Sequence, residues 1–128
     1  AANKVYFSGT QFFNSAPMAA AIATINELKN IDATSLMHHH GNDLKNKMIS
    51  MAKSYDIDLK VTGVPSMPYF RIENDDKELH FKWVDNCLSK GIYMTSYHNH
   101  FLSAVHQESE IDLIVNLASK ALEEVVED

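Results

Sequence analysis

The residues between Glu108 and Glu127 carry the clearest periodic pattern in the sequence. Apolar side chains recur there at the three- and four-residue spacing of one helix face, at Ile111, Ile114, Val115, Ala118, Leu122 and Val125. Glu108 and Glu110 favour the start of this helix because acidic side chains interact well with the positive end of the helix dipole. The pattern predicts a long amphipathic helix, which restricts the chain to folds that pack one helix face against other layers.

Three earlier stretches are also predicted to be helical, over residues 17–28, 32–55 and 77–90. Pro17 is favoured in the first turn of a helix, Asp32 is a candidate N-cap, and Gly91 stands where a C-cap glycine is common. The expected apolar faces are Met18, Ala21, Ile22, Ile25 and Leu28 in the first helix, Met37, Leu44, Met48, Met51, Ala52 and Tyr55 in the second, and an inward-pointing Phe81, Val84 and Leu88 in the third.

Short β-prone runs occur at residues 5–7, 59–61, 67–73, 92–95 and 101–104. The Asn-Asp-Asp sequence that follows the third run, at residues 74–76, is expected to form a turn or a helix cap. Together the elements predict an α+β fold, in which a small, mostly antiparallel sheet packs against three to four helices. The length of 128 residues suits a single domain over residues 1–128.

Charge and cysteine content exclude several classes of function. The net charge of −6 argues against non-specific nucleic-acid binding, which requires clustered basic side chains to neutralise phosphates. No apolar run approaches the roughly 20 residues that cross a bilayer, so we expect no membrane partner. The single cysteine, Cys87, can form neither an intrachain disulfide nor a thiolate metal cluster, which fits a reducing cytoplasm. We expect Cys87 to be a buried packing residue rather than a nucleophile.

The histidines form two groups. His38, His39 and His40 are consecutive, so on a helix they point about 100° apart and cannot converge on one metal ion. We expect them to form an exposed polar segment. In the second group, His98 and His100 would share one face of an extended segment, and a zinc site completed by His106 is an alternative interpretation.

The turn Ser8–Gly9–Thr10 can present backbone N–H groups and a hydroxyl to a phosphate, although such turns are common. No Walker or dinucleotide-binding fingerprint occurs in the sequence. A serine–histidine–aspartate triad could be assembled from Ser96 or Ser103 with His98 and Asp112. No nucleophile-elbow sequence supports such a triad. Residue types alone therefore indicate an α+β domain without a convincing catalytic centre.

Five segments of the sequence together match one family pattern, namely Phe7–Thr10 together with Pro17–Ile25, then Val61–Met67, Leu88–Tyr93, His98–His106 and Glu108–Asp112. The corresponding family segments read FSGT…PLAMAAALATL, VTGxGSM, LLxRGIY, HNWFLSAAH and EEDID. In order and spacing, the five segments resemble class-III aminotransferases that use pyridoxal phosphate, with glutamate-1-semialdehyde 2,1-aminomutase as the most similar branch. The resemblance covers nearly the whole chain, and its specificity comes from the order of the five segments rather than from any one of them.

The resemblance implies the C-terminal small domain of a homodimeric fold-type-I enzyme, with residues 1–30 leading back to a large domain. It implies pyridoxal 5'-phosphate as the cofactor of the complete enzyme, which would pass an amino group between small-molecule donors and acceptors through a Schiff base. The Schiff-base lysine and the aspartate that pairs with the pyridine nitrogen lie upstream in the family, and Lys4 does not match the lysine motif. The chain alone is therefore expected to be inactive. Gly9 and Thr10 match the turn that reaches the cofactor phosphate of the other subunit.

Two departures from the family pattern affect the subtype. Pro65 stands where the family has the glycine of GSM, and residues 97–101 are shorter than the aminomutase counterpart. An aminotransferase for another substrate, such as a sugar or a carrier-bound keto group, thus stays open, with His98 and Asn99 near the substrate entrance. Two further alternatives are a stand-alone, non-catalytic interaction module of the same fold and a small zinc hydrolase that uses the second histidine group.

Overall fold

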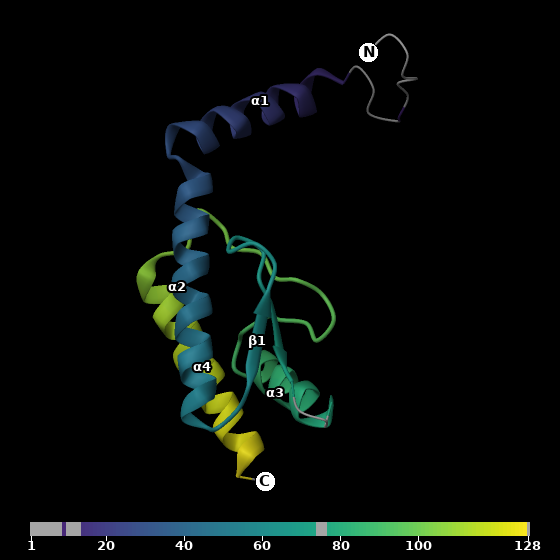
Figure 1. Ribbon diagram of the computed structural model, residues 1–128. Coiled ribbons are helices and arrows are strands. Elements are labelled where there is room, and N and C mark those ends of the chain that lie inside the picture. The colour runs from purple at the N-terminus through teal and green to yellow at the C-terminus, as the bar shows by residue number, and fades with distance from the viewer. Residues whose placement is uncertain (1–8, 10–13, 74–76, 128) are drawn as a thin grey trace. The chain divides into compact units, whose positions relative to one another are not determined.

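The computed structural model describes Gly9, residues 14–73 and residues 77–127. These residues form α1 (Ser15–Asn30), α2 (Ala33–Ser54), β1 (Leu59–Thr62), β2 (Tyr69–Ile72), α3 (Lys77–Ser89) and α4 (Glu108–Val126) (Figure 1). Four helices and a two-stranded antiparallel sheet confirm the predicted α+β fold. The chain divides into two compact units, residues 1–33 and residues 34–128.

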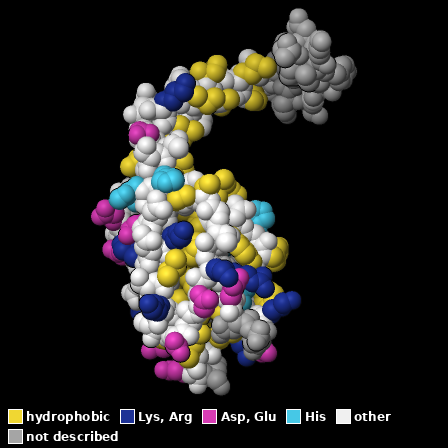
Figure 2. Space-filling view, in the orientation of Figure 1, with side chains coloured by type: hydrophobic (Ala, Val, Ile, Leu, Met, Phe, Trp, Pro, Cys, Tyr) yellow, Lys and Arg dark blue, Asp and Glu magenta, His cyan; other side chains and the backbone are white. Residues whose placement is uncertain are grey.

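The first unit contains α1, which begins where the sequence predicts a helix. Asn14 caps it, because its side-chain oxygen accepts a hydrogen bond from the backbone N–H of Ala16 over 3.2 Å. None of the residues of α1 is buried. Its apolar side chains form a nearly continuous run along the helix (Figure 2), and the larger of them are exposed by 41–62%, at Met18, Ile22, Ile25 and Leu28.

The helix predicted over residues 32–55 is confirmed as α2, but Asp32 does not have the backbone of an N-cap. Its φ of 47° lies in the left-handed region rather than in the extended region that cap residues adopt. The backbone N–H of Asp32 donates to the carbonyl of Lys29 over 3.3 Å, so Asp32 closes the last turn of α1 instead. The predicted methionine-rich face of α2 is confirmed, with Met48 and Met51 in the core.

The strands β1 and β2 pair antiparallel, with Leu59 opposite Ile72 and Val61 opposite Phe70. On one face Leu59, Phe70 and Ile72 are buried and Val61 is half-buried. The side chains between them are exposed, except for the half-buried Tyr69, as the period of two requires. The strands predicted over residues 92–95 and 101–104 are wrong, because this part of the chain is a loop. The backbone N–H groups of His100 and Leu102 donate to single carbonyls, and those of Thr95 and Ser103 donate to histidine rings. The runs at residues 5–7 and 74–76 lie outside the described residues.

The register predicted for α3 is only partly correct. Phe81 and Leu88, expected to point inward, are exposed by 50% and 51%. The buried face carries Val84, as expected, together with His80, Trp83 and Cys87. Trp83 decides this orientation, since it is fully buried and is the largest buried side chain. Gly91 ends the helix with φ +89°, as predicted for a C-cap glycine.

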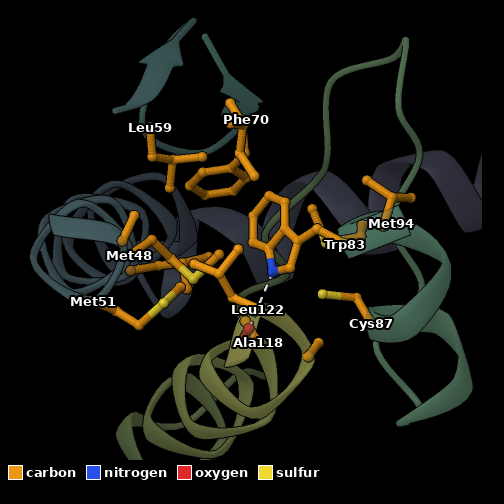
Figure 3. Packing of buried hydrophobic residues seen from close by; sticks show 14 of the residues in the cluster. Met48, Met51, Leu59, Phe70, Trp83, Cys87, Met94, Ala118 and Leu122 are labelled. Carbon is orange, nitrogen blue, oxygen red and sulfur yellow. Dashed lines mark hydrogen bonds between the residues drawn. The ribbon is translucent and has the colours of Figure 1, made fainter. Parts of the chain in front are cut away.

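The predicted stripe of α4 is confirmed, with Ile111, Ala118 and Leu122 completely buried. These residues join the core around Trp83 (Figure 3). The core also contains Met48 and Met51 of α2, Leu59 and Phe70 of the sheet, Cys87 of α3 and Met94 of the following loop. The start of α4 is fixed by the backbone N–H of Gln107, which donates to the carboxylate of Glu110 over 2.8 Å.

Polar contacts connect α2 to α4 at the edge of this core. The Nζ of Lys47 lies 2.6 Å from a carboxylate oxygen of Asp112, and the hydroxyls of Tyr55 and Ser119 are 3.0 Å apart. Basic and acidic side chains are interspersed over the face shown in Figure 2. None of the helices in the described ranges combines the length and apolarity that a membrane crossing requires.

Candidate functional site

The two residues that the sequence assigns to a cofactor phosphate lie at the edge of what the structure describes. Gly9 is exposed, and a Cβ added there would meet no heavy atom within 4 Å. Thr10 lies outside the described residues. The phosphate contact of Gly9 and Thr10 therefore stays a prediction.

The chemistry-bearing side chains that the structure does bring together lie on the loop between α3 and α4, residues 90–107. This α3–α4 loop exposes four large apolar or aromatic side chains, namely Tyr93 by 83%, Tyr97 by 84%, Phe101 by 63% and Val105 by 73%. Met94 and Leu102, by contrast, are buried in the core. A loop with buried anchors and outward aromatic side chains is suited to contact a ligand or another protein surface.

His80 of α3 fastens this loop to the sheet. Its Nδ1 accepts a hydrogen bond from the backbone N–H of Ile72 over 3.4 Å, and its Nε2 donates to the carbonyl of Ser96 over 3.3 Å. Burial is the main cause of a lowered pKa of His80, with a smaller contribution from the positive charge of Arg71. Sequence reasoning did not single out His80; its three-residue spacing from Trp83, once Trp83 is taken as the inward anchor, is the signal that identifies it.

His100 holds the same loop from within. Its Nε2 accepts from the backbone N–H of Thr95 over 3.1 Å, and its Nδ1 donates to the carbonyl of Pro68 over 3.3 Å. The backbone N–H of His100 donates to the same carbonyl over 2.7 Å. Burial lowers the pKa of His100, and the charges of His98 and His80 act in the same direction. Both rings are thus held neutral with one fixed tautomer each.

A cavity of about 290 Å³ lies beside the α3–α4 loop. Its walls come from α2, β2, the loop and α4 and are mainly apolar. The lining residues are Leu44, Met48, Phe70, Gly91, Ile92, Tyr93, Met94, His100, Phe101, Leu102, His106, Leu113, Ile114, Leu117 and Ala118. The Nδ1 of His106 accepts from the backbone N–H of Ser103 over 3.0 Å, so the neutral ring carries its proton on Nε2. An apolar cavity with a few polar groups is typical of small-molecule sites.

The histidine groups take different environments from those expected. His38 and His39 are exposed on α2, whereas His40 is buried, so the prediction of an exposed segment is wrong for His40. Within the described residues, the Nδ1 of His40 has no hydrogen-bond partner. The ring of His98 interacts with the carbonyl of Asn99 over 2.9 Å. In the described part of the chain, no three His, Cys, Asp or Glu side chains are grouped to hold a metal ion.

The ionisable groups with shifted pKa values do not form a nucleophile. A lysine that forms Schiff bases needs a lowered pKa. The hydrogen bonds that Lys47 donates to Asp112 and Asp43 instead raise its pKa, and the hydrogen bond from Lys60 to Glu73 raises that of Lys60. Burial raises the pKa of Cys87 to about 12, which keeps it a thiol. Because Asp112 pairs with Lys47, it is also not directed at a histidine of a catalytic triad.

No family model matches the chain. The chain is similar over its whole length to an aminopentol aminotransferase of Sphingopyxis macrogoltabida, with 29% identity over 129 residues that make up 31% of that protein. It is also similar, with 25% identity over 97% of the chain and 31% of the relative, to a 3-aminobutyryl-CoA aminotransferase of Cloacimonas acidaminovorans (strain Evry). The chain thus spans about a third of the length of these curated relatives.

Solved structures agree with this likeness. The FumI protein of Sphingopyxis sp. MTA144, in its PLP internal aldimine form, matches 99% of the chain with a TM-score of 0.91 and 28% identity, over 31% of that protein. An omega-transaminase from Sphaerobacter thermophilus matches 94% of the chain with a TM-score of 0.79 and 18% identity, over 30% of its length. The fold is therefore that of the C-terminal domain of PLP-dependent transaminases.

Proposed function

We propose that the chain is the C-terminal small domain of a class-III aminotransferase that uses pyridoxal 5'-phosphate. One observation carries this proposal: nearly the whole chain superposes on less than a third of a protein in its PLP internal aldimine form, at 28% identity. The cofactor would supply an electron sink for the bond changes at the substrate carbon. A cytoplasmic location belongs to the same proposal, and the single buried cysteine is consistent with it.

In this proposal the chain's own residues bind and position rather than react. The backbone N–H of Gly9 or Thr10 and the hydroxyl of Thr10 would donate to the cofactor phosphate of the second subunit in a homodimer. The exposed aromatic side chains of the α3–α4 loop, Tyr93, Tyr97 and Phe101, would meet the large domain or the bound substrate. The chain alone would be inactive, because the Schiff-base lysine lies upstream in the family and Lys4 does not match its motif.

Borohydride trapping tests the cofactor assignment. The complete reading frame that contains this sequence would be purified with pyridoxal phosphate, reduced and analysed by mass spectrometry beside the 128-residue chain. We expect one stable label in the complete protein and none in the 128-residue chain. A label on a lysine of the 128-residue chain would contradict the proposal, as would a natural reading frame with no upstream domain, which would favour the stand-alone interaction module.

Substitutions at Thr10 test its contact with the phosphate. In the complete protein, Thr10→Ala would remove one charge-assisted hydrogen bond worth about 1.5–3 kcal/mol, which weakens pyridoxal phosphate binding by roughly 10- to 150-fold. Thr10→Ser keeps the hydroxyl and serves as the matched control, with affinity close to the parent. Equal affinity of all three proteins would show that Thr10 does not contact the phosphate.

We also propose an aminotransferase rather than an aminomutase, supported by the two aminotransferases among the relatives and by the departures at Pro65 and residues 97–101. An aminotransferase needs a separate amino donor and keto acceptor, whereas an aminomutase rearranges one substrate. The complete protein would be incubated with an amine and a labelled keto acid. Transfer of the amino group to the keto acid is expected; rearrangement of glutamate-1-semialdehyde without any acceptor would contradict it.

A further inference from the structure

Two neutral histidines form hydrogen bonds to adjacent residues of the α3–α4 loop, His80 to Ser96 and His100 to Thr95. His80 reaches the segment through the carbonyl of Ser96, a carbonyl that also accepts from the hydroxyl of Tyr69 over 2.8 Å. His100 reaches it through the backbone N–H of Thr95. Both rings also bind the β2 side, at the N–H of Ile72 for His80 and at the carbonyl of Pro68 for His100.

We propose that His80 and His100 form a two-histidine latch that holds residues 95–101 against the sheet while both rings are neutral, and that protonation of the rings releases this segment before the core unfolds. The latch concerns the chain's own conformation and does not depend on the proposed enzymatic function.

The direction of the effect follows from the donors that each ring faces. A histidine accepts a hydrogen bond only at its unprotonated nitrogen. On protonation, the Nδ1 of His80 would carry a hydrogen that faces the N–H of Ile72, and the Nε2 of His100 would carry one that faces the N–H of Thr95. Each of these two contacts changes from a hydrogen bond to a donor–donor clash, so His80 loses its bond to β2 and His100 loses the bond that closes the segment onto Thr95.

The surrounding charges do not compensate the protonated rings. Around His80 they are Arg71 of β2 and Lys77, which both line a cavity of about 430 Å³ beside the ring. Around His100 they are His98, His80 and, across the apolar cavity, His106. Among the described residues, no carboxylate contributes to the pKa shift of either ring. The charged forms are therefore disfavoured in the latched state.

The released segment is bounded by the packing on either side of it. Met94 and Leu102 are 7% and 8% exposed and belong to the core cluster, so they keep the two ends of the segment in place. The core beyond them is held by apolar contacts and by the Trp83–Ala118 hydrogen bond, which do not titrate in this pH range. Release therefore frees residues 95–101, including the exposed side chains of Tyr97 and Phe101, without unfolding the domain.

The linkage gives an expected size. The pKa of each ring in the latched state lies below the ordinary histidine value of about 6.5, which the ring regains on release. The latch is therefore intact above pH 6.5 and weakens as the pH falls below that value toward the lowered pKa. In that window each histidine raises the opening equilibrium about tenfold per pH unit.

Amide hydrogen exchange of the 128-residue chain, corrected for the intrinsic exchange rate, tests the latch at pH 7 and pH 5.5. The amides of Ile72, Thr95 and His100 should lose protection about tenfold or more per pH unit, while that of Leu122 in α4 stays protected. His100→Gln retains an acceptor for the Thr95 amide but does not titrate, so it should reduce the pH dependence. His38→Gln, at an exposed ring of α2 that does not contribute to the pKa shift of either latch histidine, should leave it unchanged.

Three results would overturn the proposal: constant protection of the segment at both pH values, equal loss of protection in the segment and in α4, or the same pH dependence in His100→Gln and His38→Gln. Direct titration of the ring signals in the unmodified chain keeps the test decisive if His100→Gln does not fold. His80 and His100 should both titrate below pH 6.5 together with the Thr95 amide signal. Titration of either ring at or above pH 6.5 would refute the latch.

Discussion

Trp83 donates its indole N–H to the backbone carbonyl of Ala118 over 3.0 Å, and this bond joins α3 to α4 at the centre of the core (Figure 3). Ala118 has no side chain beyond Cβ, so the indole can lie against the α4 backbone. The bond fixes which face of α3 points inward. It thereby places His80, one helical turn before Trp83, beside the sheet and the α3–α4 loop.

Substitutions at two neighbouring positions of α3 test this orientation. Trp83→Phe removes the indole hydrogen bond and leaves a cavity, and we expect it to lower the free energy of unfolding by about 2–3 kcal/mol. Phe81→Ala, on the exposed face, should cost less than about 1 kcal/mol. Urea unfolding followed by circular dichroism measures both. A larger loss for Phe81→Ala than for Trp83→Phe would show that α3 packs in the register expected from the sequence.

Gly41, in the middle of α2, is a position where helix propensity and packing oppose each other. Alanine is favoured over glycine inside a helix by about 1 kcal/mol. A Cβ at Gly41, however, would lie 1.9 Å from the backbone oxygen of Pro65, which cannot move aside like a flexible side chain. We expect overpacking to dominate, so that Gly41→Ala lowers the free energy of unfolding by about 1–3 kcal/mol.

Asn46→Ala is the matched control for Gly41→Ala, because Asn46 is exposed on the same helix. Its replacement by a better helix former should raise the free energy of unfolding by a few tenths of a kcal/mol, roughly the difference in intrinsic propensity. Chemical denaturation of both variants decides the sign. Stabilisation by Gly41→Ala would mean that α2 does not approach the Pro65 backbone closely.

The exposed apolar face of α1 leads us to expect self-association of the 128-residue chain. Ile22 and Ile25 are 62% and 51% exposed, and such a face normally marks a contact surface. Light scattering across a concentration series should show species larger than a monomer. The double substitution of both isoleucines by glutamate should shift the chain to a monomer.

A control with equal charge uses the opposite face of α1. Ala20 and Ala23 lie there, as the rotation of 100° per residue requires, and both are exposed. Replacing these two alanines by glutamate should leave the self-association in place. A chain that is monomeric at every concentration without any substitution would contradict a role of α1 in association.

The sequence predicted the elements more reliably than their contacts. All four helices and the strands of the sheet are confirmed, because hydrophobic periods of 3.6 and 2 are local properties. Periodicity alone could not decide which face of α3 points inward. One helical spacing selects Phe81, Val84 and Leu88, and another selects Trp83 and Cys87. The size of Trp83 and its bond to Ala118 resolve this choice, and both act through tertiary packing.

The loop shows a second reason for failure. Residues 92–95 and 101–104 have β-prone composition, but β1 and β2 form the complete sheet in the described residues. The loop donors are satisfied instead by single bonds, such as those from His100 to Pro68 and from Leu102 to Ser66. The ring of His100 accepts from the N–H of Thr95, and the ring of His106 accepts from the N–H of Ser103. Such long-range pairs, of which His100 and Pro68 are 32 residues apart in the sequence, leave no local pattern.

Cys87 provides a test of core packing that involves no substitution in the core. It is fully buried next to Trp83, and burial raises the pKa of its thiol to about 12, although Lys90 acts in the opposite direction. Alkylation requires the thiolate, so the folded chain at pH 8 should react far more slowly than the urea-unfolded chain, in which the pKa returns to about 8.5. Mass spectrometry after iodoacetamide treatment counts the label.

Ser50→Cys, on the exposed face of α2, adds a reactive control thiol to the same chain and should be labelled once without urea. Rapid labelling of Cys87 in the folded chain would mean that α3 and α4 separate often. The labelling rate of Cys87 relative to the control thiol therefore measures how firmly the Trp83–Ala118 contact holds the two helices together.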